Sequence, residues 1–133
     1  MTDAKFSAVT DESIRRLVDE FYGRVRDDAA LGPVFANAIK DWEPHLATMR
    51  DFWSSVMTTS GRYKGNPVMK HRQVDGISYE LFERWLALFD ETARALFEPA
   101  LAAVFSAKAA RIAESLRLAV FYRPDQPWPP TAA

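Results

Sequence analysis

The sequence predicts an all-α protein built from four long helices. Apolar side chains recur at intervals of three and four residues along most of the chain, which is the spacing of one face of an α-helix. Residues that favour helix starts precede these stretches, and no stretch alternates apolar and polar residues as a half-buried strand would. A chain of 133 residues has the length of one domain and can bury a sizeable core.

The first long helix is expected over residues 11 to 26. Thr10 can cap its start, and Asp11 suits the positive end of the helix dipole. Its apolar face consists of Ile14, Leu17, Val18, Phe21, Tyr22 and Val25. A turn and a short apolar helical piece follow, from Leu31 to about Lys40.

The second long helix is expected from Asp41, as a cap, to about Thr59, with Pro44 tolerated in the first turn. The apolar stripe of this helix consists of His45, Met49, Phe52 and Val56. Residues 60 to 67 contain glycine and proline and predict an irregular loop. A very short helix that carries His71 comes next.

Two further long helices are expected, one from the cap Ser78 to about Phe97 and one from Pro99 to about Tyr122. The inward side chains of the first of these are expected to be Phe82, Trp85, Leu86, Phe89 and Ala93. Those of the second are expected to be Leu101, Val104, Phe105, Ile112, Leu116 and Val120. The sequence thus predicts one domain over residues 1–122 and an extended, loosely attached proline-rich tail over residues 123–133.

Composition excludes several classes of function. Seventeen basic residues against eighteen acidic ones give a net charge of −1, and no basic run is long enough to follow a nucleic acid backbone. The absence of cysteine excludes disulfides and iron–sulfur clusters. No apolar stretch at the start resembles a signal peptide and none could span a membrane, so a soluble cytoplasmic protein is expected.

The chain has only two histidines, His45 on the second long helix and His71 on the short helix after the loop. Neutral imidazole is a good iron ligand, and imidazoles on two facing helices could bracket a flat cofactor. Ordinary histidines without a ligand explain these two residues equally well. The roles of Tyr22 and Trp85 are also undecided at this point, because packing in the core would account for both residues. If their side chains converge with His45, the three supply a hydroxyl, an imidazole and an indole N–H for a small bound ligand.

The order of the motifs is more specific than the single residues, and over about residues 6 to 122 it resembles the third group of truncated haemoglobins. The motifs that carry the resemblance are Phe21-Tyr22, Leu31-Gly32-Pro33-Val34-Phe35, Trp42-Glu43-Pro44-His45, Phe52-Trp53, Tyr63-Lys64-Gly65-Asn66-Pro67, His71, Phe82 and Trp85-Leu86-Ala87-Leu88-Phe89. The resemblance implies a shortened globin fold, in which two antiparallel helix pairs form a two-over-two sandwich around haem b (iron protoporphyrin IX). The proline-rich tail has no counterpart in that pattern.

The resemblance also assigns roles to individual residues. It implies that His71 is the proximal ligand of the haem iron and that Phe35 wedges against the porphyrin. The distal positions that face a bound gas correspond to Tyr22, His45 and Trp85. Further haem contacts are implied for Met49, Phe52 and Trp53, which would line or back the haem, and for Tyr63 and Lys70, which would meet the propionates.

The function implied is binding of dioxygen, nitric oxide and carbon monoxide at ferrous iron. Detoxification of nitric oxide or a peroxidase-like turnover would need a separate reductase, because the chain has no glycine-rich nucleotide-binding motif. A haem-based gas sensor, or a helical interaction module that has kept only the fold, is the alternative. A non-haem metal hydrolase that uses His45 and His71 is disfavoured, because no carboxylate stands at ligand spacing on the same helix faces.

Overall fold

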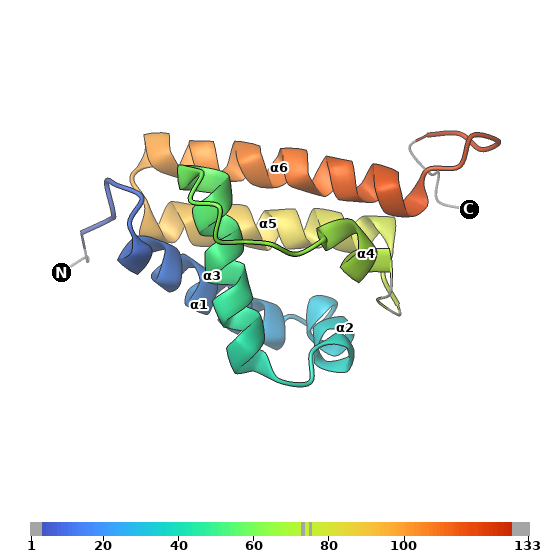
Figure 1. Ribbon diagram of the computed structural model, residues 1–133, viewed down its shortest axis with the longest axis horizontal. Helices are drawn as coiled ribbons and strands as arrows, with labels where there is room; N and C mark the ends of the chain where they lie inside the picture. Colours follow the sequence, from blue (N-terminus) through green and yellow to red (C-terminus); the bar gives the residue numbers. More distant parts are fainter. Residues whose placement is uncertain (1–3, 73, 75, 129–133) are drawn as a thin grey trace.

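The computed structural model describes residues 4–72, 74 and 76–128, apart from the side chains of residues 68, 69 and 72. Four long helices carry the fold, namely α1 (Asp11–Asp27), α3 (Trp42–Thr58), α5 (Tyr79–Leu96) and α6 (Pro99–Phe121). Two short ones, α2 (Leu31–Ala38) and α4 (Pro67–Arg72), connect them (Figure 1). The described part of the chain contains no strand, only an isolated bridge between Phe6 and Phe97. The predicted all-α fold is confirmed.

The long helices form two layers of two. α5 and α6 run antiparallel along the length of the molecule, joined by a short corner (Figure 1). α1 packs against α5 and also against α3, which crosses in front of it. α2 contacts α1 and α5, whereas α4 lies against α6. The arrangement is the expected two-over-two sandwich.

Three of the helix starts follow directly from local side-chain chemistry. The hydroxyl of Thr10 accepts from the N–H of Ser13 at 3.0 Å, while the hydroxyl of Ser13 accepts from the N–H of Thr10 at 2.9 Å. Ser78 accepts from the N–H of Leu81, and Pro99 is the first residue of α6. These predicted starts are confirmed. The start of α3 has a different cause, because Asp41 occupies the cap position but its side chain makes no capping hydrogen bond.

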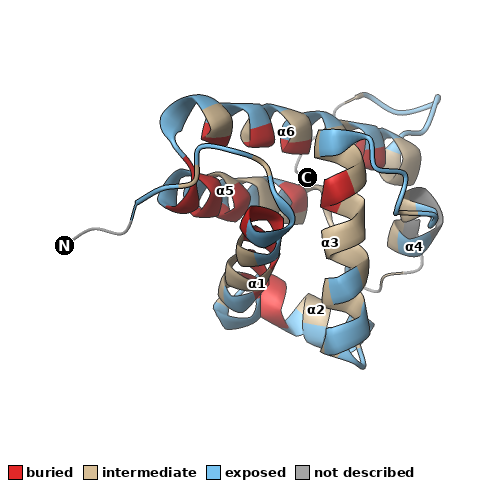
Figure 2. Cartoon of the chain, turned by 60° about the vertical axis from the view of Figure 1, so that its left-hand side comes forward, coloured by how far each residue is buried: buried red, intermediate tan, exposed pale blue. Residues whose placement is uncertain are grey.

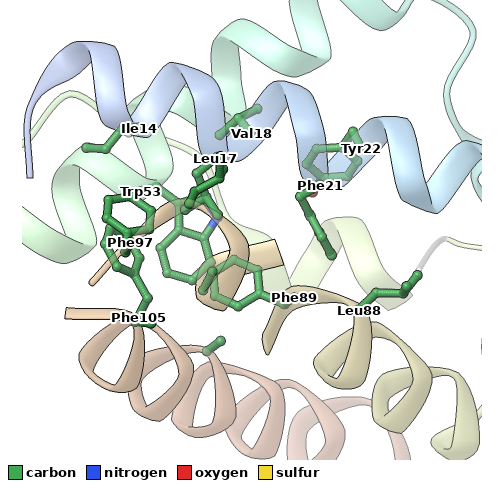
Figure 3. Close-up of a cluster of buried hydrophobic side chains, with 14 of the residues drawn as sticks. Ile14, Leu17, Val18, Phe21, Tyr22, Trp53, Leu88, Phe89, Phe97 and Phe105 are labelled. Atoms are coloured by element: carbon green, nitrogen blue, oxygen red, sulfur yellow. The ribbon is translucent and has the colours of Figure 1, made fainter. Parts of the chain in front are cut away.

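Aromatic rings from several helices meet in the core (Figure 3). Trp53 of α3 stacks on Phe89 of α5, with ring centroids 4.7 Å apart, and Phe97 lies 4.5 Å from Phe105 of α6. All four rings are fully buried. Truncation of a ring of this kind to alanine costs about 3–5 kcal/mol, so this cluster fixes α3 against the α5–α6 pair.

One predicted core residue lies at the surface. Val104 is 44% exposed, although its spacing placed it on the inward face of α6. The side of α6 that meets the core is set by Ala102, Phe105 and Ala109, and Val104 stands about 100° around the helix from Phe105. The apolar surface of α6 is therefore wider than the side that it buries.

The tail turns back where the structure describes it. The N–H of Gln126 donates to the carbonyl of Arg123, and the ring of Trp128 lies 5.8 Å from that of Tyr79 and 5.9 Å from that of Tyr122. Residues 123–126 thus form a turn and not an extended segment, and the tryptophan that follows lies against an aromatic surface, as a loosely attached tail could. Residues 129–133 lie outside the described part.

None of the helices in the described residues is long and apolar enough to cross a membrane.

Candidate functional site

The apolar stripe of α3 packs against the core on one side and is only partly covered. Its members His45, Met49, Phe52 and Val56 are all half-buried, and the only fully buried residues of α3 are Trp53 and Ser54. Figure 2 shows this contrast, since α1 and α5 carry more residues coloured as buried than α3 does. A row of apolar side chains left half open is a feature of binding surfaces rather than of finished cores.

His71, on α4, is oriented by its own helix. Its Nδ1 lies 2.6 Å from the carbonyl oxygen of Pro67, which can only accept a hydrogen bond, so Nδ1 is the donor. In the neutral ring, Nε2 then carries the free lone pair. The ring also lies 6.0 Å from that of Phe82, which limits its rotation. An imidazole held through Nδ1 with Nε2 free is the arrangement of a metal-ligating histidine.

Tyr22 and His45 meet in the region that the stripe faces. The phenol ring from α1 and the imidazole from α3 lie edge to face, with centroids 5.2 Å apart. Burial raises the pKa of the Tyr22 hydroxyl well above its ordinary value, so it stays protonated and can donate. The two side chains therefore form a polar pair in an apolar setting.

The imidazole of His45 has an unused polar atom. Its Nε2 is buried and has no hydrogen-bond partner among the described residues. Burial lowers the pKa of His45, and the charge of Lys70 lowers it further, so the ring is neutral near pH 7. Lys70 directly precedes His71 in the sequence.

Trp85 stands one ring away from this pair. It stacks on Phe89 at 5.4 Å and meets Phe21 edge to face at 5.2 Å, and Phe21 in turn meets Tyr22 at 5.0 Å. These contacts fix the plane of the half-buried indole. The structure thus brings Tyr22 and His45 into contact and connects Trp85 to them through Phe21.

The other residues expected around a haem occupy different environments. Phe35 is half-buried in the middle of α2 and lies 5.9 Å from the ring of Tyr22. Phe52 lies 5.2 Å from Tyr63. Burial raises the pKa of the Tyr63 hydroxyl. Trp53 belongs to the core behind the stripe, so it can only back a ligand.

Lys70 and Gly65 mark the solvent side of this region. Lys70 is exposed on α4. Gly65 makes room for Tyr63, because a Cβ at position 65 would lie 2.5 Å from the Tyr63 hydroxyl oxygen. Both features belong to the loop and short helix that the sequence placed before His71.

Sequence reasoning gave no role to Trp42, which lies in the middle of this site. Its ring meets His45 edge to face at 5.6 Å and lies 6.0 Å from the ring of Tyr22. The signal was present, because residues three apart on a helix share a face and Trp42 stands three before His45.

The corner that carries Phe35 depends on Asp28, which was also missed. One carboxylate oxygen of Asp28 accepts from the backbone N–H groups of Ala30 and Leu31 at 3.1 and 2.9 Å, and the other accepts from Arg84 of α5. The hydrogen bond from Arg84, followed by that from Leu31, lowers the pKa of Asp28. Aspartate favours such local bonds to backbone N–H groups two or three residues ahead, which is the signal that the sequence offered.

Close approach of α1 and α2 completes this corner. A Cβ at Gly32 would lie 2.8 Å from the backbone carbonyl oxygen of Arg26, so any larger residue would push the two helices apart. The chain can therefore reverse sharply and bring Phe35 next to Tyr22.

A model of the bacterial-like globin family matches residues 6–120 of this chain. The group 3 truncated haemoglobin ctb of Campylobacter jejuni is 36% identical over 113 residues, which cover 82% of this chain and 89% of that protein. This chain belongs to the group 3 truncated haemoglobins. A crystal structure of the group III truncated haemoglobin from Campylobacter jejuni superposes with a TM-score of 0.84, at 34% identity, over 89% of this chain and 96% of the other.

The geometry fits the haem that membership of this globin family implies. This truncated haemoglobin offers an oriented imidazole with a free Nε2 at His71, a half-open apolar stripe on α3, and an unpartnered buried nitrogen at His45. Globins bind diatomic gases, and the polar pair of Tyr22 and His45 suits a small polar ligand.

The described residues give less support to a non-haem metal site. Among them, no three His, Asp or Glu side chains gather in a way that could hold a metal ion. The described residues therefore provide no set of ligands for the metal ion that a hydrolase of this kind would need.

Proposed function

We propose that this protein binds dioxygen, and also nitric oxide and carbon monoxide, at ferrous haem b with His71 as the proximal ligand. The observation that carries the proposal is the contact between Tyr22 and His45, in which a protonated hydroxyl lies beside a neutral imidazole with an unpartnered buried nitrogen. A buried polar atom without a partner is costly unless a ligand satisfies it.

The haem would supply an iron with one coordination position open to a diatomic ligand. His71 would bind the metal through Nε2, while the carbonyl of Pro67 keeps the ring from turning. Phe35, Met49 and Phe52 would contact the porphyrin from α2 and α3. Tyr63 and Lys70 would meet the propionates, since one offers a phenol and the other an exposed ammonium group.

The distal residues would hold the gas by hydrogen bonding. A hydrogen bond to a neutral acceptor is worth about 0.5–1.5 kcal/mol, and one to a charged acceptor about 1.5–3 kcal/mol. Donors from Tyr22 and Trp85 together would slow dissociation of dioxygen by about ten- to a thousandfold. His45 acts either as a further donor or as a gate that swings out to admit the ligand.

Slow release of dioxygen suits a reaction at the haem better than delivery of oxygen. We therefore infer that the physiological reaction is conversion of nitric oxide and dioxygen to nitrate, with electrons from a separate reductase that returns the iron to the ferrous state. This inference is supported by the donor set at the distal side and by the absence of a nucleotide-binding motif in the sequence.

Rapid mixing tests the proposal. The ferrous haem-loaded protein is saturated with dioxygen, and its release is followed by replacement with carbon monoxide. Nitric oxide is then added to a second sample, and the nitrate formed is quantified. Slow release with one nitrate per haem supports the proposal, whereas failure to bind dioxygen reversibly contradicts it.

A further inference from the structure

Three rings from two helices contact one another beside the proposed ligand site. Tyr22, Trp42 and His45 are called the ring cluster here. The centroid distances are 5.2 Å between Tyr22 and His45, 5.6 Å between Trp42 and His45, and 6.0 Å between Tyr22 and Trp42. The imidazole is thus bounded by a ring edge or face on two sides.

Ring packing, not hydrogen bonding, sets the position of His45. Its buried Nε2 has no partner, and within the described residues no hydrogen bond to its side chain is present. Edge-to-face ring contacts are strong enough to bias a side chain between two rotamers without fixing it permanently. Loss of either neighbouring ring would free the imidazole to move towards solvent.

Trp42 is itself held from α1. The guanidinium carbon of Arg26 lies 4.7 Å from the centroid of the Trp42 ring. Arg26 stands one turn after Tyr22, so the indole packs across a single turn of α1 and touches both. In the described part of the chain the Arg26 guanidinium forms no ion pair, which leaves the ring face as its contact.

This packing also takes the place of a conventional cap. Trp42 is the first residue of α3, and the preceding Asp41 makes no capping hydrogen bond. The start of α3 is therefore positioned by the indole between Arg26 and Tyr22. His45 lies one turn further along, so its location depends on the same contact.

We propose that Trp42, clamped by Arg26, is a positioning residue that holds the His45 imidazole over the ligand site and so limits ligand exchange. The inference rests on the proposed gas-binding function. It means that Trp42 and Arg26, which lie outside the expected distal set, control how fast the ligand exchanges. Three side chains then act in series: the imidazole of His45 moves, the ring of Trp42 blocks its exit, and the guanidinium of Arg26 holds the Trp42 ring in place.

Carbon monoxide association after flash photolysis measures this control directly. Trp42→Ala is expected to raise the association rate by about two- to tenfold, the value of one aromatic contact. Trp42→Phe should restore most of the parent rate, because it keeps a ring against His45. Arg26→Gln should change the rate in the same direction by about two- to fivefold, as expected for loss of a cation–π contact at an exposed site.

A double-mutant cycle distinguishes positioning from simple obstruction. If Trp42 acts through His45, Trp42→Ala has no effect on association in a His45→Ala background. Trp128→Ala is the matched control, because it removes a half-buried indole that contacts Tyr79 and Tyr122 far along the chain. It should leave the association rate unchanged.

A spectroscopic signal reports the imidazole itself. In the diamagnetic ferrous carbon monoxide complex, the chemical shifts of the His45 ring protons should change towards unshielded values in Trp42→Ala. They should stay at the parent values in Trp42→Phe. Parent-like association and His45 shifts in Trp42→Ala would overturn the inference while gas binding stands, and so would an effect that persists in the His45→Ala background. Failure of the parent to bind carbon monoxide would instead overturn the proposed function.

Discussion

The hydroxyl-bearing ring of Tyr22 and the imidazole of His45 meet edge to face at 5.2 Å, although they belong to different helices. The crossing of α3 over α1 creates this contact, and neither helix could provide it alone. A protonated phenol and a neutral imidazole therefore share one apolar region, where a small polar ligand would find hydrogen-bond partners and little competing water.

Substitution of Tyr22 by Phe should speed dissociation of dioxygen by about tenfold, because it removes one hydrogen bond to the ligand and little packing. The measurement is replacement of dioxygen by carbon monoxide in a rapid-mixing instrument. Tyr122→Phe is the control, since this tyrosine is 47% exposed at the end of α6. An off-rate equal to that of the parent would remove Tyr22 from the proposed distal donors.

Ligand association should accelerate as the pH falls from about 7 to about 5, the range in which histidine gains its charge. Burial, and then the charge of Lys70, lower the pKa of His45 below its ordinary 6.5, so the neutral ring is stable in place above that pH and loses this stability as the pH falls through its folded value. The charged imidazole then leaves for solvent. Flash photolysis across this range checks the effect, and His45→Leu should abolish it. A pH-independent parent would exclude a titrating gate.

Substitution of Asp28 by Ala should lower the free energy of unfolding by about 0.5–2 kcal/mol, the usual value of a helix cap. Urea titration measures this, with Asp27→Ala as the control because Asp27 is exposed at the end of α1. Equal stability of the two variants would show that Asp28 contributes nothing beyond its charge.

The contribution of Asp28 should also disappear in acid. Hydrogen bonds from Arg84 and Leu31 hold its pKa below the ordinary 3.8, so its stabilisation is complete above that pH and is lost as the pH falls through the lower folded value. The difference in unfolding free energy between the parent and Asp28→Asn should therefore shrink in acid. A constant difference would assign the effect to the shape of the side chain.

Substitution of Trp128 by Ala should lower the stability by about 1 kcal/mol and the Tm by roughly 3–5 °C, because the indole covers Tyr79 and Tyr122. Thermal unfolding followed by circular dichroism measures the shift, and Trp128→Phe should recover part of it. No change in Tm would mean that the tail contact adds nothing to the fold.

The helix starts could be predicted because they depend on neighbouring residues. Thr10, Ser78 and Pro99 each act within three residues along the chain, and the structure confirms all three. The side of each helix that faces the core was harder to predict. Val104 satisfied the apolar spacing of α6, but spacing cannot indicate how wide a face the partner helices cover.

For the candidate site, the sequence indicated which residues take part but not which side chains contact one another. The ordered motifs singled out Tyr22, His45 and His71, whereas the clamp of Arg26 on Trp42 depends on the crossing of α1 and α3. Such a contact has no signature in either segment alone. The orientation of His71 is an exception, because its partner Pro67 lies one turn earlier on the same short helix.

The absorption spectrum of the purified, haem-loaded protein and of its His71→Ala variant, before and after dithionite and carbon monoxide, tests the central claim most directly. Histidine-ligated haem predicts a sharp Soret band that shifts on reduction and shifts again with carbon monoxide in the parent, and that is lost or altered in the variant. Absence of haem uptake by the parent, or identical spectra of parent and variant at every step, would contradict ligation by His71.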